Sequence, residues 1–130
     1  APTPSAPPED RPRHNLTSFG NCERFLDAYA HELRFVPQFG QWKAWDGARW
    51  APDHAMAVQE RGKAIVRGLV DEAQAETDPE IRKLTMKWAM KCEATAAVEA
   101  MVELAKSDPR VVRTAEIWDT DPDVLNVANG

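Results

Sequence analysis

The chain has 130 residues, a length that suits one domain built around a single hydrophobic core. Its hydrophobic content of 43% and charged content of 28% are those of an ordinary globular protein, and no apolar run is long enough to span a bilayer. The net charge of −5 argues against a domain that binds nucleic acid through bulk attraction to phosphate. A nucleic-acid contact would therefore need a local basic patch or a neighbouring domain.

The two cysteines, Cys22 and Cys92, lie among apolar residues and do not form a Cys-x-x-Cys motif. This pattern favours reduced, buried thiols in a cytoplasmic protein, with a disulfide between them as the alternative. The N-terminal residues also lack the charged and apolar regions of a secretory signal. We therefore expect an intracellular protein.

The first fifteen residues hold five of the ten prolines and almost nothing apolar. Such a composition cannot bury enough surface to offset the entropy of ordering, so residues 1–15 are predicted to be a linker or tail. Residues 16–130 are predicted to form one domain. It opens with a short amphipathic helix, capped by Thr17 or Ser18, whose apolar residues recur every three or four positions: Phe19, Cys22, Phe25, Leu26 and Tyr29.

Three tryptophans within nine residues predict a β-hairpin after this helix. A β-favouring run at 33–36 precedes hairpin arms at 41–45 and 48–50. The turn centre is one of two pairs, Asp46-Gly47 or Gly47-Ala48.

Both turn registers give the same two faces, because side chains alternate along a strand. Lys43, Trp45 and Trp50 share one face, and Trp42 and Ala44 share the other. At least one tryptophan is therefore expected to lie in the core.

The chain becomes helical after Pro52, where Asp53 can cap a helix. The apolar stripe of this helix is Ala55, Val58, Gly62, Ile65, Val66, Leu69 and Ala73. The segment 77–80 starts a second helix, predicted to run to about Lys106 and, because it is apolar over much of its circumference, to lie at the centre of the bundle.

A third, shorter helix is predicted from the segment 107–109 through Ile117, followed by an extended tail at 124–130. The predicted fold class is mainly α with a small antiparallel β element.

Motifs of catalysis are absent from the sequence. It contains no phosphate loop, no dinucleotide-binding glycine motif, no His/Cys cluster with metal-ligand spacing and no nucleophile elbow. The acidic residues Asp119, Asp121 and Asp123 are interpreted as a solvated loop. We expect this chain to be neither an enzyme by itself nor the holder of a cofactor or metal.

One basic run is a candidate for phosphate contact. Lys83, Lys87 and Lys91 are spaced four residues apart along one edge of the second predicted helix, with Arg82 beside them. Like charges at this spacing mildly destabilise a helix, so a phosphate partner would offset them. The alternative is a solvated face near Glu80 and other acids.

A second candidate is the mixture of basic and aromatic residues in the hairpin. Arg34, Lys43 and Arg49 alternate with Phe35 and three tryptophans, as on surfaces where bases stack on rings. The alternative is that these rings are the core of a small domain.

The order of motifs resembles one family. A GNxxRF helix (Gly20 to Phe25), an LRFVP strand (Leu33 to Pro37), a GxWxxWDGxRW hairpin (Gly40 to Trp50), two long helices and a final LNVANG follow one another. This order is similar to the domain immediately N-terminal to the helicase in phage and plasmid primase–helicases, which are superfamily 3 DNA helicases. The resemblance covers about residues 17 to 130.

The resemblance implies a module of a longer replication protein, with primase and helicase domains as neighbours and a homo-oligomer formed through the helicase. ATP and Mg²⁺ are implied for that full-length enzyme and not for this chain. The implied role is to couple primase to helicase and to hold single-stranded template or primer. Two other functions stay open: a protein–protein collar that never touches DNA, and a nucleotide-handling module for primer initiation.

Overall fold

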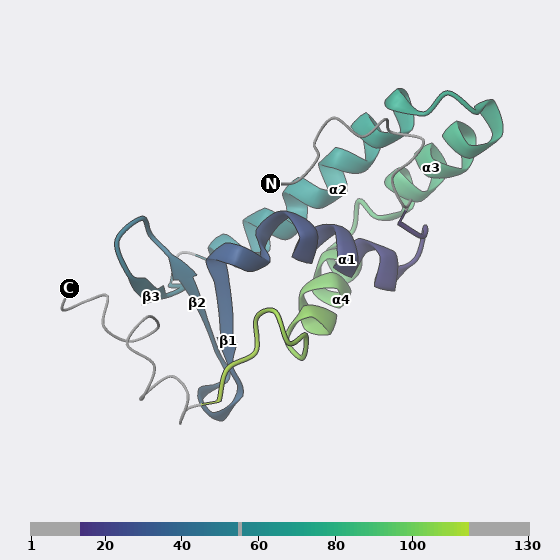
Figure 1. Ribbon diagram of the computed structural model, residues 1–130. Helices are drawn as coiled ribbons and strands as arrows, with labels where there is room; N and C mark the ends of the chain where they lie inside the picture. The colour runs from purple at the N-terminus through teal and green to yellow at the C-terminus, as the bar shows by residue number, and fades with distance from the viewer. Residues whose placement is uncertain (1–13, 55, 115–130) are drawn as a thin grey trace.

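The computed structural model describes residues 14–54 and 56–114, which form a helical bundle beside a small sheet (Figure 1). The helices are α1 (Ser18–Tyr29), α2 (Ala57–Ala75), α3 (Pro79–Lys91) and α4 (Thr95–Ala105). The strands are β1 (Leu33–Val36), β2 (Gln41–Trp45) and β3 (Trp50–Pro52), antiparallel in the order β1-β2-β3, and the single-turn helices η2 (Ala30–Glu32) and η3 (Pro37–Phe39) flank β1. This confirms the predicted class, mainly α with a small antiparallel sheet.

Side-chain acceptors hold three helix starts, and those at Thr17 and Asp53 are predicted by the sequence. Thr17 Oγ1 accepts a hydrogen bond from the Gly20 amide at 3.0 Å. The Asp78 side chain accepts from the first amides of α3, and the Asp53 carboxylate accepts from the amides of Ala57 and Val58 at the start of α2. Each carboxylate or hydroxyl satisfies backbone donors that have no partner inside the helix.

The hydrophobic core lies where α1, α2 and α4 meet β1. Its largest fully buried side chains include Phe25, Leu26, Leu33, Leu69 and Met101. The predicted stripe of α2 is confirmed at its buried positions, Val58, Gly62, Val66, Leu69 and Ala73. A Cβ on Gly62 would lie only 3.0 Å from a methyl of Val98, so glycine there allows α2 and α4 to approach closely.

A buried arginine joins the N-terminal segment, α1 and α2. Arg24 is only 7% exposed, and its Nε and Nη2 donate to the two carboxylate oxygens of Glu72 at 2.9 and 2.8 Å. Its remaining N–H groups donate to the carbonyls of Asn15 and His14 and to Asn21 Oδ1. All five guanidinium donors are therefore used, which is what makes burial of this charge tolerable.

Asn21, 1% exposed, joins α1 to α3. Its Oδ1 accepts from Trp88 Nε1 at 3.0 Å as well as from Arg24, and its Nδ2 donates to Cys92 Sγ at 3.3 Å. Gly20, one residue earlier, passes so close to the Asn15 carbonyl that a Cβ would clash with it. The GNxxRF motif is therefore a packing and hydrogen-bonding centre of the fold.

The sheet has the two faces that the sequence predicts. Trp42 pairs with Phe35 across β1 and β2 and packs with Ala44 on the core. Trp45 pairs with Trp50 across β2 and β3 on the other face, with ring centroids 5.4 Å apart.

The turn between β2 and β3 is centred on Gly47-Ala48. The Asp46 amide donates to the Arg49 carbonyl at 3.0 Å, and Gly47 has a φ of 102°, a region that favours glycine. The Asp46 carboxylate accepts from the amides of Ala48 and Arg49, which lowers the pKa of Asp46. This selects the second of the two predicted registers.

The prediction of one helix from residue 79 to about Lys106 is wrong. The chain breaks at Cys92–Ala94, where Ala94 is extended, and continues as α4 in a new direction. No proline or glycine marks this break. Its cause is tertiary, since α4 buries Met101, Val102 and Ala105 against α1 and α2, which a straight continuation of α3 could not do.

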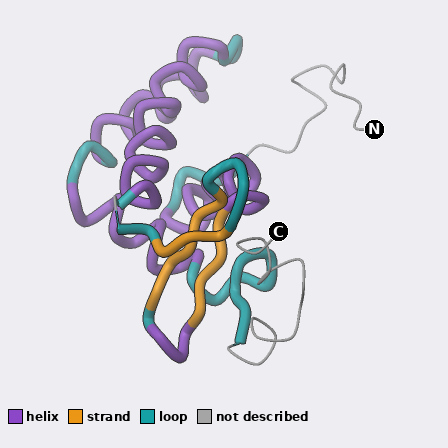
Figure 2. Tube along the Cα trace, turned by 90° about the vertical axis from the view of Figure 1, so that its left-hand side faces the viewer, coloured by secondary structure: helices purple, strands orange, loops and turns teal. Residues whose placement is uncertain are grey.

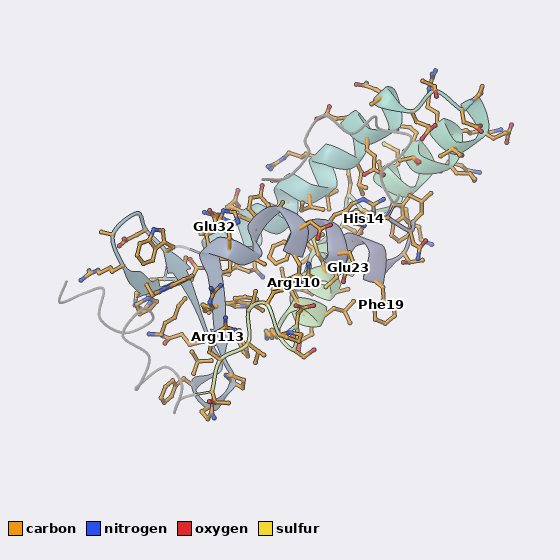
Figure 3. All side chains as sticks on the ribbon, in the orientation of Figure 1. His14, Phe19, Glu23, Glu32, Arg110 and Arg113 are labelled. Atoms are coloured by element: carbon orange, nitrogen blue, oxygen red, sulfur yellow. The ribbon has the colours of Figure 1, made fainter. Side chains whose placement is uncertain are left out.

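The predicted central position of the second helix is wrong as well. Only Thr85 and Ala89 of α3 are buried, and two of its large apolar residues face outward, with Leu84 55% and Met90 60% exposed. Figures 1 and 2 show α3 packed along the outer part of α2, far from the sheet. Phe19 also departs from its predicted stripe: it is 72% exposed and points away from the fold (Figure 3).

The third predicted helix does not form over the described part of its range. The backbone carbonyl of Asp108 closes a single turn by accepting from the amides of Val111 and Val112, and the chain then runs parallel to β1. Val112 forms a bridge with Phe35, and Val111 is fully buried. Pairing with β1 therefore replaces helix growth here. Ile117, the acidic residues at 119–123 and the LNVANG ending lie outside the described residues.

Arg110 fastens this turn to α1. Its guanidinium donates to carboxylates of Glu23, Asp27 and Asp108 at 3.0 to 3.2 Å (Figure 3). These contacts raise the pKa of Arg110, and the hydrogen bond with Arg110 lowers the pKa of Asp108. His14 Nε2 lies 2.9 Å from Asp27 in the same group.

Both cysteines are buried and unpaired, as the sequence predicts. Burial, together with the nearby charge of Glu23, raises the pKa of Cys22 to about 11. Cys22 is therefore a protonated packing residue at neutral pH.

Candidate nucleic-acid interface

The helix α3 presents the first predicted set of cations. Asp78 starts the helix by accepting from the amides of Glu80 and Ile81, and Pro79 occupies its first turn. Ala89 and Thr85 then fix one side against the bundle, with Thr85 Oγ1 donating to the Ile81 carbonyl at 2.8 Å. Trp88 also packs against the core, and the side of the helix that carries the cations faces solvent.

All four predicted phosphate-contact residues of α3 are exposed: Arg82, Lys83, Lys87 and Lys91. Arg82 Nε donates to a backbone carbonyl, and Lys91 Nζ lies 6.0 Å from the ring centroid of Trp88. Within residues 14–54 and 56–114, none of the four forms an ion pair with a carboxylate. Successive lysines are about 6 Å apart along the axis, from the helical rise per residue. We call this row the basic edge of α3.

Apolar side chains lie between these cations. A pocket of about 580 Å³ on α3 is lined by Pro79, Arg82, Lys83, Met86, Lys87 and Met90. Leu84 and Met90 are more than half exposed. The surface is therefore mixed, with methionines bordered by positive charge.

The second predicted set of cations lies on the sheet. Arg34 and Lys43 pair directly across β1 and β2, and the Arg34 guanidinium carbon lies 4.6 Å from the ring centroid of Trp50. Arg49 is in the turn, with its Nε 3.7 Å from Asp46. The fold thus brings Arg34 and Lys43 onto the face that carries Trp45 and Trp50, and leaves Arg49 at the edge of it.

The two basic sets do not meet. In both views the sheet lies at one end of the molecule and α3 toward the other (Figures 1 and 2). One compact ligand could not contact both, so they are separate candidate surfaces.

Sequence reasoning missed Arg24 and Arg113. Arg24 lies in the quoted GNxxRF motif, and its spacing from Asn21 was a signal that both face one side of the helix. Arg113 was not identified because its segment was predicted to be helical. In the structure, the Arg113 amide instead donates to the Phe35 carbonyl of β1.

Comparison with known protein families decides the context of these surfaces. Residues 22–130 match the family described as D5 N terminal like. The chain belongs to this family. The D5 N-terminal-like domain is an N-terminal domain of the phage and plasmid primase–helicase proteins, so the resemblance seen in the motifs is confirmed. No curated protein and no solved structure matches the chain significantly.

The structure assigns a physical role to the residues of the motifs quoted above. In the first motif, Asn21 and Arg24 are buried and hold helices together, so they are structural residues. In the hairpin motif, Trp42 belongs to the core, whereas Trp45 and Trp50 form an edge-to-face pair on the outer face.

Metal and membrane sites find no support in the described part of the chain. No three His, Cys, Asp or Glu side chains in residues 14–54 and 56–114 are grouped to hold a metal ion. None of the described helices combines the length and the apolar character needed to cross a bilayer.

Proposed function

We propose that this domain is a non-catalytic module of a DNA-replication primase–helicase that holds single-stranded template or primer along the basic edge of α3. In this role it couples the primase to the helicase by keeping the strand between them. The observation that carries the proposal is the exposure of Arg82, Lys83, Lys87 and Lys91 without a carboxylate partner in the described residues. Family membership supplies the replication context.

The physical reason is charge compensation. Three lysines on one helix edge repel one another, and the phosphates of a strand laid along that edge would remove the repulsion. Contact with single-stranded phosphates also releases counterions, so the affinity should fall as salt rises, by about 0.7 logarithmic units per phosphate contact and decade of salt. Arg34, Lys43 and Arg49 are proposed as a second, separate contact beside Trp45 and Trp50.

The test is binding of a fluorescent oligothymidylate to the 130-residue chain, followed by anisotropy at several salt concentrations. The variant K83E/K87E should lower the affinity at least tenfold and flatten its dependence on salt. The control K63E/R67E makes the same change of net charge on exposed positions of α2 and should leave most of the affinity intact. Equal losses in the two variants, or no binding by the unaltered chain, would refute the proposal.

A second candidate is a collar that binds a neighbouring primase or helicase domain. The observation that favours it is the pair of exposed apolar residues, Leu84 and Met90, among the same cations. A strand of phosphates gains nothing from them, whereas a protein partner would bury them. The variant L84S/M90S separates the candidates: a collar loses its association with the neighbouring domain, whereas a strand holder keeps its oligothymidylate affinity.

A further inference from the structure

Arg34 is held in an orientation that leaves one edge of its guanidinium unused. Its Nη1 donates to the carbonyls of Ala30 and Leu33, at 2.8 and 2.6 Å, and its guanidinium carbon lies over the ring of Trp50, 4.6 Å from the centroid. Its Nε is buried and has no hydrogen-bond partner. A buried donor without a partner is costly, so this edge is suited to an acceptor that comes from elsewhere.

Arg113 is held in the same manner. Its Nη1 donates to the carbonyls of Pro109 and Val112, at 3.1 and 2.7 Å, and in the described residues its Nε and Nη2 donate to no acceptor. Backbone carbonyls orient both arginines, and no described carboxylate neutralises either of them. Arg110, only three residues away, shows the contrast, because its guanidinium is taken up by three carboxylates.

The two guanidiniums are neighbours. The Arg113 amide donates to the carbonyl of Phe35, the residue after Arg34, so the segment that carries Arg113 lies alongside β1 (Figure 3). Burial, and then the charge of Arg113, lower the pKa of Arg34. Glu32, the residue before β1, is already paired with Arg61. Two positive charges therefore lie near each other beside β1, and no described carboxylate pairs with either of them.

We propose that Arg34 and Arg113 form a binding site for a phosphate group. The Nε and Nη2 atoms of a guanidinium match two oxygens of a phosphate, and a planar arginine stacked on an aromatic ring is well ordered for such a bidentate contact. The phosphate comes either from a nucleic-acid backbone or from the chain of a free nucleotide. This site lies on the sheet, away from the basic edge of α3, and does not depend on it.

The experiment is a titration of the isotope-labelled 130-residue chain with two probes, followed through the arginine Nε–H signals. The probes are inorganic pyrophosphate and a hexathymidylate without terminal phosphates. A saturating shift of the Arg34 and Arg113 signals with at least one probe is the expected result. A response to pyrophosphate alone assigns the site to nucleotides, and a response to the hexathymidylate alone or to both assigns it to a phosphodiester backbone. No saturating shift with either probe would overturn the proposal.

Variants test the site independently of the spectra. R113Q should weaken binding of the responding probe about tenfold or more, and R34K should do the same because lysine keeps the charge but lacks the planar fork. The control R67Q removes the same charge from an exposed position of α2, outside the turn that carries Arg113, and should leave the affinity unchanged. If R34K does not fold, R113Q alone tests the site. An affinity of R113Q for the probe equal to that of the unaltered chain would overturn the proposal.

Discussion

The helices α1 and α3 have almost the same length, 12 and 13 residues, and opposite relations to the bundle. Six residues of α1 are buried, including the polar Asn21 and Arg24, whereas α3 buries only Thr85 and Ala89 and exposes Leu84 and Met90. Polarity alone therefore does not decide burial. A charged residue is buried where the fold supplies an acceptor for every donor, and an apolar residue is exposed where no other element covers it.

The largest effect is expected from removing the buried arginine of α1. Arg24→Ala should lower the free energy of unfolding by about 3 kcal/mol, because the links to Glu72 and to the N-terminal carbonyls are lost together with the packing of the side chain. The control Arg82→Ala, on α3, should change it by less than about 0.5 kcal/mol. Urea unfolding of both variants measures the difference, and similar losses would contradict the contrast between the two helices.

A smaller loss is expected from Asn21→Ala. Trp88 Nε1 would lose its acceptor in a buried site, which should cost about 2 kcal/mol. Asn15→Ala is the matched control, since Asn15 contributes only its backbone carbonyl, and it should cost little. The indole N–H signal of Trp88 should move in the first variant only. A loss of stability without that movement would place the effect elsewhere.

The contact between α1 and the turn at Asp108 should depend on pH. Hydrogen bonding to Arg110 lowers the pKa of Asp108, so its stabilising contribution is complete above the ordinary value of 3.8 and is lost as the pH falls below it. R110Q should therefore be less stable than the unaltered chain at pH 7, and the two should converge as the solution is acidified. A constant difference in unfolding free energy from pH 7 to pH 3 would show that Asp108 does not carry the effect.

The smallest effect is expected on the exposed face of α3. K83Q/K87Q/K91Q should change the free energy of unfolding by less than about 0.5 kcal/mol, and toward higher stability, because repulsion between like charges is removed. Ala89→Leu, on the buried side of the same helix, should cost about 2 kcal/mol by overpacking. Thermal unfolding compares the two, and a large loss in the lysine variant would mean that these side chains support the fold.

Local patterns in the sequence were sufficient for much of this architecture. Thr17 and Asp78 are caps because their side chains bond to amides within three residues, and the stripe from Val58 to Ala73 is buried because helical spacing puts it on one side. The two faces of the hairpin follow from alternation in the same way. The basic edge of α3 is exposed, which fits both alternatives that its spacing left open, a phosphate contact and a solvated face.

Contacts between residues far apart in the sequence decided the rest. The break at Cys92–Ala94 has no local signal, because it arises from the burial of α4 against α1 and α2. Asp108 and Pro109 are good helix-starting residues, yet the chain pairs with β1 at Val112 instead of continuing as a helix. By itself the sequence determined the family, most of the element types and the two sets of basic residues, since these depend on composition and short-range spacing. Only the tertiary structure decided which cationic side chains are buried, which are exposed and which are neighbours. Each of these outcomes depends on acceptors and neighbours brought together from distant parts of the chain.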